Sequence, residues 1–197
     1  MTRPTVIFFG PDAGPSTSPK VYFRSLLFST SKRGRVIESM HVSLSRNENR
    51  QNFSIWVYGE KHLMRGSGLF VGETGISANH HFLTQKEDVK FCFVAGSYHV
   101  EVYAKLVGDR KQILLFSQTL EVTREEAKAL ETRQAGLYFD WGPDASRYLK
   151  HVDTKLDRDP EMVDVLLNLM RSSGSVVRND DEGEPGISTY GLRGSDP

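Results

Sequence analysis

The sequence predicts a mostly β protein: an antiparallel β-sandwich of about seven or eight strands, followed by C-terminal helices and a flexible tail. Three observations carry this prediction. Short apolar or alternating runs follow one another closely from residue 5 to residue 122, with turn-forming segments between them and no helical pattern among them. After residue 122 the apolar spacing becomes helical. After residue 171 the apolar content falls too low to offset the entropy of an ordered chain.

The expected strands are separated by Gly, Pro, Asn, Asp and Ser residues, which favour turns. Residues 98–107 alternate most clearly, with Tyr98 on the apolar face and His99 on the polar face. The segment VGDRKQ that follows is typical of a hairpin loop. The expected strands cover residues 6–9, 21–29, 36–44, 53–59, 69–72, 91–95, 98–107 and 112–122.

The first expected helix begins after Thr123. Thr123 and Glu126 have the spacing of a capping box, in which each side chain accepts a hydrogen bond from the other residue's backbone N–H. The helix then carries a thin apolar stripe of Ala127 and Leu130. The segment GLYFDWGPD predicts an aromatic turn or short strand, and residues 146–159 predict a polar connection.

A second helix is expected over residues 160–170. Asp159 can cap it, and Pro160 suits its first position, where the missing N–H costs nothing. We expect this helix either to close the sandwich as a lid or to bind a partner through Val163, Leu167 and Met170. Its wide apolar face comprises Met162, Val163, Val165, Leu166, Leu167, Leu169 and Met170.

These expectations divide the chain into three parts. Residues 1–122 form the sandwich, residues 123–171 form a helical extension packing on it, and residues 172–197 form the flexible tail.

Charge and cysteine content exclude several classes of function. Lys and Arg total 25 and Asp and Glu total 25, so the surplus of cations that a nucleic-acid or anionic-membrane surface needs is missing. Cys92 is the only cysteine, which excludes an intramolecular disulfide and a multi-cysteine zinc site. No apolar run has the length of a signal-peptide core or a membrane-spanning helix, so we expect a soluble, cytoplasmic protein.

A possible metal site comes from a comparison with cupins, jelly-roll proteins that bind a metal through His, His, Glu and a later His. Adjacent histidines in a strand point to opposite faces, whereas the cupin pattern separates them by one residue. Only eleven residues lie between Glu87 and His99, where cupins place a further strand and loop. We therefore expect loop histidines and an outward-facing His99, with a metal site as the alternative. The residues of that alternative are His80, His81, Glu87 and His99.

Other catalytic patterns are incomplete. Cys92 lies between Phe91 and Phe93 in an apolar run, which predicts a buried, inert thiol. The segment GLFVGETG lacks the lysine of a phosphate-binding loop, and no nucleophile elbow is present. Asp140 and Asp144 flank a Gly-Pro turn, which explains them as well as a sugar site would. We expect no catalytic residues and no cofactor.

The segments AGSYHVEVYAKL and QILLFSQTLEVT resemble the late strand pair of immunoglobulin-like and fibronectin-III-like domains. The resemblance implies that Tyr98 is the corner tyrosine and that Trp56 is a core aromatic on an earlier strand. It implies a sandwich architecture and no particular function, because this superfold carries many functions.

Two functions remain open. The first is a non-enzymatic protein-interaction or assembly module that binds a protein partner or a second copy of itself. The alternative is a jelly-roll enzyme that binds a metal or small ligand through the histidines above. The lack of a coherent catalytic set favours the first.

The outward orientation of His99 gives a first prediction. Because the side chain faces solvent, His99→Ala should change the free energy of unfolding by about half a kcal/mol or less in denaturant titrations. A loss of several kcal/mol would place His99 on the buried face and overturn the register.

Overall fold

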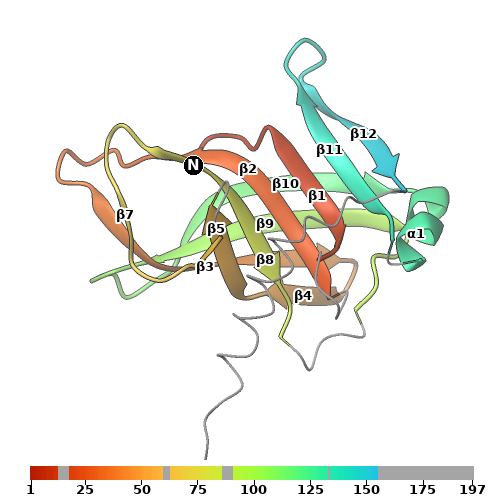
Figure 1. Ribbon diagram of the computed structural model, residues 1–197, viewed down its shortest axis with the longest axis horizontal. Coiled ribbons are helices and arrows are strands. Elements are labelled where there is room, and N and C mark those ends of the chain that lie inside the picture. The colour runs from red at the N-terminus through yellow and green to blue at the C-terminus, as the bar shows by residue number, and fades with distance from the viewer. Residues whose placement is uncertain (13–17, 60–62, 86–90, 133, 155–197) are drawn as a thin grey trace, which may run out of the picture.

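A computed structural model describes residues 1–12, 18–59, 63–85, 91–132 and 134–154. Within these residues the chain forms two antiparallel sheets and one helix, with most residues in strands (Figure 1). The inner faces of the two sheets share one apolar core. The prediction of a mostly β, antiparallel, sandwich-like architecture is therefore confirmed.

The first sheet contains seven strands in the order β12-β11-β1-β2-β8-β5-β6. Strands distant in the sequence meet here, since β11 pairs with β1 and β8 lies between β2 and β5. The strands are β1 (Val6–Pro11), β2 (Pro19–Leu27), β5 (Ile55–Gly59), β6 (Met64–Arg65), β8 (Ile76–Leu83), β11 (Gly136–Gly142) and β12 (Arg147–Asp153).

The second sheet has the order β10-β9-β3-β4, and β7 pairs with the start of β3. The hairpin expected around VGDRKQ is confirmed, because β9 and β10 pair antiparallel on either side of it. The strands are β3 (Arg35–Arg46), β4 (Asn49–Phe53), β7 (Leu69–Val71), β9 (Gly96–Leu106) and β10 (Ile113–Val122).

Alternation along the strands decides which side chains enter the core. In β9, Val100 and Val102 are fully buried. His99, which lies between Tyr98 and Val100 in the strand, is exposed, as the sequence predicted. Trp56 on β5 also lies in the core with 2% of its surface exposed, as expected. Burial of such side chains removes apolar surface from water and supplies the main driving force for folding.

Tyr98 fixes the loop that precedes its strand. Its hydroxyl donates to the carbonyl oxygen of Val94 and accepts from the amide N–H of Val94, both at 2.9 Å. The same loop places the ring of Phe93 against the core, stacked on Phe9 at a centroid distance of 5.0 Å. A corner tyrosine makes this type of bond to backbone a few residues upstream.

Helix α1 (Arg124–Glu131) begins as the sequence predicted. The Thr123 hydroxyl accepts from the Glu126 amide at 3.2 Å, and the Glu126 carboxylate accepts from the Thr123 amide at 2.7 Å. These reciprocal bonds satisfy two backbone donors that the first turn cannot use. Ala127 and Leu130 are buried and join the core, which confirms the predicted stripe.

Two predictions about buried and exposed groups are wrong. Residues 91–95 do not form a strand, and Cys92 is exposed rather than buried. In an extended segment, the side chains of Phe91 and Phe93 point to one side and pack on the core, so Cys92 between them points away. His80 and His81 lie in strand β8 rather than in a loop, and both are buried.

The described part of residues 123–171 is not a helical extension alone. After α1 the chain adds the hairpin of β11 and β12 to the first sheet, which therefore continues beyond residue 122. Strand β12 occupies half of the polar connection expected over residues 146–159. The expected helix over residues 160–170, with Val163, Leu167 and Met170, and the tail over residues 172–197 lie outside the described residues.

The bonds of Tyr98 give the second prediction. Tyr98→Phe should lower the free energy of unfolding by about 1–3 kcal/mol, because the Val94 amide and carbonyl lose a partner inside the fold. Tyr103→Phe is the matched control: its hydroxyl donates to Glu101 on the solvent-facing side of the same strand, and a change within about 0.5 kcal/mol is expected. Equal effects of the two substitutions in urea titrations would contradict the structural role of Tyr98.

Candidate functional site

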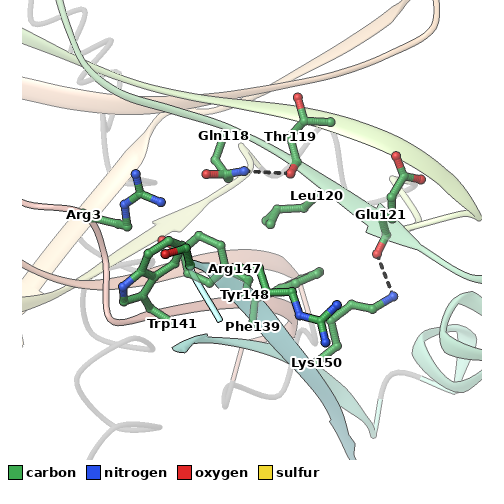
Figure 2. Close-up of a pocket in the computed structure, with 11 residues that line it drawn as sticks. Arg3, Gln118, Thr119, Leu120, Glu121, Phe139, Trp141, Arg147, Tyr148 and Lys150 are labelled. Atoms are coloured by element: carbon green, nitrogen blue, oxygen red, sulfur yellow. Dashed lines mark hydrogen bonds between the residues drawn. The ribbon is translucent and has the colours of Figure 1, made fainter. Parts of the chain in front are cut away.

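A cleft of about 280 Å³ opens between edge strand β10 of the second sheet and the β11–β12 hairpin of the first (Figure 2). The segment before β1 forms its third side. The residues lining it are Arg3, Gln118, Thr119, Leu120, Glu121, Phe139, Trp141, Ser146, Arg147, Tyr148 and Lys150.

The register of the hairpin brings the aromatic residues of the cleft together. Trp141 on β11 lies directly opposite Tyr148 on β12, and their rings meet edge to face with centroids 5.2 Å apart. Phe139, two residues before Trp141, is on the same face and belongs to the core. The turn of the hairpin contains Asp144, in agreement with the turn predicted from Gly-Pro. Asp140 instead lies in β11 and contacts His151 at 3.0 Å.

Two hydrogen bonds fix the N-terminal segment on this hairpin. The Tyr148 hydroxyl donates to the Pro4 carbonyl at 2.8 Å, and the Trp141 amide donates to the Thr5 carbonyl at 2.9 Å. They hold Arg3 so that its guanidinium lies over the Trp141 ring at 4.0 Å from the centroid (Figure 2). Burial raises the pKa of Tyr148, which keeps its hydroxyl protonated as a donor at neutral pH.

The cleft carries a local surplus of positive charge, although the whole chain is balanced. Three of its residues are cations, Arg3, Arg147 and Lys150, whereas Glu121 is the only carboxylate among the described residues that line it. Lys150 is paired with Glu126 at 2.9 Å. Arg3 and Arg147 make no ion pair with any residue in the described part of the chain.

Side-chain donors occupy the exposed backbone of β10 along the cleft. Lys150 donates to the carbonyl of Glu121 at 3.1 Å, and Gln118 donates to the carbonyl of Thr119 at 3.0 Å (Figure 2). An edge strand without such partners is a template for another strand. These carbonyls are already satisfied, so a ligand in the cleft would meet side chains rather than add a strand to β10 at these residues.

The residues of the predicted metal alternative are not brought together. His80 points into the core, where the Trp56 indole N–H donates to its Nδ1 at 3.3 Å. His81 lies on the opposite face of β8, with its ring 4.9 Å from that of Tyr22. His99 belongs to the other sheet, exposed beside Thr119 at 3.3 Å.

Glu87, the fourth member of that alternative, lies outside the described residues. Among the residues that the structure does describe, no three His, Cys, Asp or Glu side chains are placed to hold a metal ion. In the same part of the chain, no helix is long and apolar enough to cross a membrane.

None of the protein-family models, curated proteins or solved structures compared with the chain matches it. The resemblance to immunoglobulin-like domains therefore stays a prediction.

Sequence reasoning did not find the cleft. It weighed a sugar site only at Asp140 and Asp144, whereas the cations of the cleft come from segments more than 140 residues apart, at Arg3 and in β12. The alternation of RYLKHVD, with Tyr148 and Lys150 on one face, was the available signal.

The buried histidines give the third prediction. Burial lowers the pKa of His80 to about 4, and burial together with the charge of Lys20 lowers the pKa of His81 well below 6.5. Both side chains are then protonated more readily in the unfolded chain, so stability is complete above pH 6.5 and falls as the pH drops toward 4. Between pH 7 and pH 5, His80 alone should account for a loss of roughly 2 kcal/mol.

Urea titrations across this range should show a smaller loss for His80→Gln than for the unsubstituted protein. His99→Gln is the control and should leave the loss unchanged, because His99 is exposed. Parallel pH profiles for all three proteins would show that His80 titrates alike in the folded and unfolded chains.

Proposed function

We propose that the chain is a non-enzymatic protein-interaction module whose cleft binds an acidic segment of a partner protein. One observation carries the proposal. Two guanidinium groups, of Arg3 and Arg147, lack a carboxylate partner among the described residues and line a cleft with Trp141 and Tyr148. The guanidinium group of arginine presents a planar fork of N–H donors that matches the two oxygens of a carboxylate. Acidic side chains of a ligand would therefore supply the missing partners of Arg3 and Arg147.

The cleft is preorganised for such a ligand. Arg3 rests on Trp141, and the bonds from Tyr148 and Trp141 to the adjacent backbone fix its position. Less conformational freedom is then lost when a ligand binds, which favours affinity. The aromatic rings offer apolar surface to the stem of a glutamate or to a neighbouring side chain.

The chemistry of the lining supports binding rather than catalysis. Arginine does not exchange protons near neutral pH, so Arg3 and Arg147 are suited to hold an anion and not to act as acid or base. Lys150 is engaged by Glu126, and the raised pKa of Tyr148 disfavours its use as a base.

The fourth prediction tests this role with a defined probe. A blocked hexaglutamate peptide should bind and change the fluorescence of Trp141, whereas hexaglutamine should not. Arg147→Ala should weaken the affinity about three- to tenfold, because one charge-assisted contact is lost from an exposed site. Raising the salt concentration should weaken binding of the unsubstituted protein, since exposed charges are screened.

Arg33→Ala is the matched control. Arg33 is an exposed arginine in the turn between β2 and β3, and its removal changes the net charge by the same amount. The affinity should stay unchanged in this variant. Equal weakening by both substitutions would indicate attraction to net charge alone, and binding of hexaglutamine as tight as that of hexaglutamate would rule out recognition of carboxylates.

A further inference from the structure

The outer face of the first sheet carries a transverse row of side chains that the proposed function does not use. Six neighbouring strands each contribute one residue to this row, and each of these residues lies directly opposite its neighbour on the adjacent strand. From β12 to β8, the aromatic and histidine rings of neighbouring residues contact one another. The row runs in strand order through His151, Tyr138, Phe8, Tyr22, His81 and Val57.

One half of this row is buried although it faces away from the core. His151 at one end is exposed, whereas Phe8, His81 and Val57 are 4%, 5% and 1% exposed. In the next row, Lys20 and Leu83 lie opposite each other and are 7% and 1% exposed. None of the helices and strands in the described ranges lies over this face, because α1 packs on β11 and joins the core and the second sheet lies on the inner side (Figure 1).

Buried apolar side chains on an outward face mean that the sheet has a second packing surface. Phe8, Val57, Leu63 and Leu83 are buried but do not belong to the core cluster between the sheets. A sheet packed on one face only would alternate between buried and exposed residues, whereas β8 ends in a buried run of four, from His80 to Leu83. We call the surface formed by Phe8, Lys20, Val57, His81 and Leu83 the outer layer.

We propose that residues 160–170 of the same chain dock on the outer layer, across β1, β2, β8 and β5. The sequence of this segment supplies the complementary surface. At 100° per residue its seven large apolar side chains centre on Leu166, and Glu161, Asp164, Asn168 and Arg171 occupy the opposite side. A face this wide needs a partner surface wider than the edge of one strand.

The connection is long enough. The described chain ends at residue 154, just after β12, which is separated from β1 by β11 alone. Residues 155–159 extend at most about 17 Å at roughly 3.5 Å per residue. Two strand spacings of about 4.8 Å bring the chain from β12 to β1. A helix over residues 160–170 would then span about 16 Å, which is enough to cross the next three strands.

The polar residues of the outer layer are compatible with an apolar cover. Burial lowers the pKa of His81, so its ring is uncharged at neutral pH. Burial lowers the pKa of Lys20 to about 8, and the charge of Asp12 opposes this shift; the amine lies 5.4 Å from the centroid of the Phe8 ring. The layer therefore resembles a core surface more than a solvated one. It is also independent of the cleft, which lies on the inner side of β11 and β12.

Thiol labelling of the full-length chain tests the proposal. In a Cys92→Ser background, Val57→Cys places a probe in the outer layer and Val102→Cys places a matched probe in the core between the sheets. A maleimide should react slowly with both. Adding Leu166→Ala should speed labelling at position 57 by at least about tenfold, because labelling follows the population of the open state, and should leave position 102 unchanged. Asn168→Ala, on the polar side of the segment, should change neither rate.

Other results would overturn the proposal. Rapid labelling at position 57 without Leu166→Ala would mean that the outer layer is open to solvent in the folded protein. If Leu166→Ala leaves the labelling rate at position 57 unchanged, and the double substitution Val163→Glu and Leu167→Glu also leaves it unchanged, another part of the molecule covers the outer layer. Protection that increases with protein concentration would identify a second copy as the occupant. Faster labelling at position 102 as well would mean that the segment supports the whole fold rather than covering one face.

Discussion

The packing of Phe9 against rings from both sheets is the contact on which the rest of the structure depends. Its side chain is fully buried on β1, stacked on Phe93 at 5.0 Å and edge to face with Tyr98 and Phe139 at 5.8 and 5.2 Å. Tyr98 belongs to the second sheet, Phe139 to the hairpin that extends the first, and Phe93 to the loop before β9. One side chain therefore joins both layers, and aromatic pairs at such distances contribute beyond the area that they bury.

The cleft follows from where this packing ends. The pairing of β1 with β11 runs from Phe9 opposite Leu137 to Val6 opposite Asp140. Trp141 is the next residue of β11, and its amide bonds to Thr5 rather than to a residue of β1. The hairpin thus extends beyond the core, and its inner face still points toward the second sheet. Trp141 on that face lines the cleft, and the only strand of the second sheet on the other side of the cleft is edge strand β10. The same continuation carries the N-terminal segment, and with it Arg3, into place.

The parts of the fold that the sequence predicts are those with a single buried face or a local bond. Strand β9 alternates between apolar and polar residues because one face of its hairpin is exposed to solvent. The capping box of α1 needs only residues 123 and 126. The candidate site could not be predicted in the same way. Arg3 and Lys150 approach the same cleft through the β1–β11 pairing, and neither residue type nor local spacing indicates that pairing. Cys92 was misplaced for a different reason, since an apolar run does not reveal which of its neighbours turns inward.

The two outward faces explain why strand β8 was missed while β9 was found. On β9, His99, Glu101 and Tyr103 form a polar row toward solvent, in which Tyr103 donates to Glu101 and His99 contacts Thr119 of β10. Period-two alternation is therefore visible in the sequence. At the end of β8 both faces are buried: His80 enters the core, and His81 enters the outer layer. A strand buried on both sides has no polar face to alternate with. Two adjacent histidines then resemble a loop or a metal site, although each is held as a neutral ring by burial on its own side of the sheet.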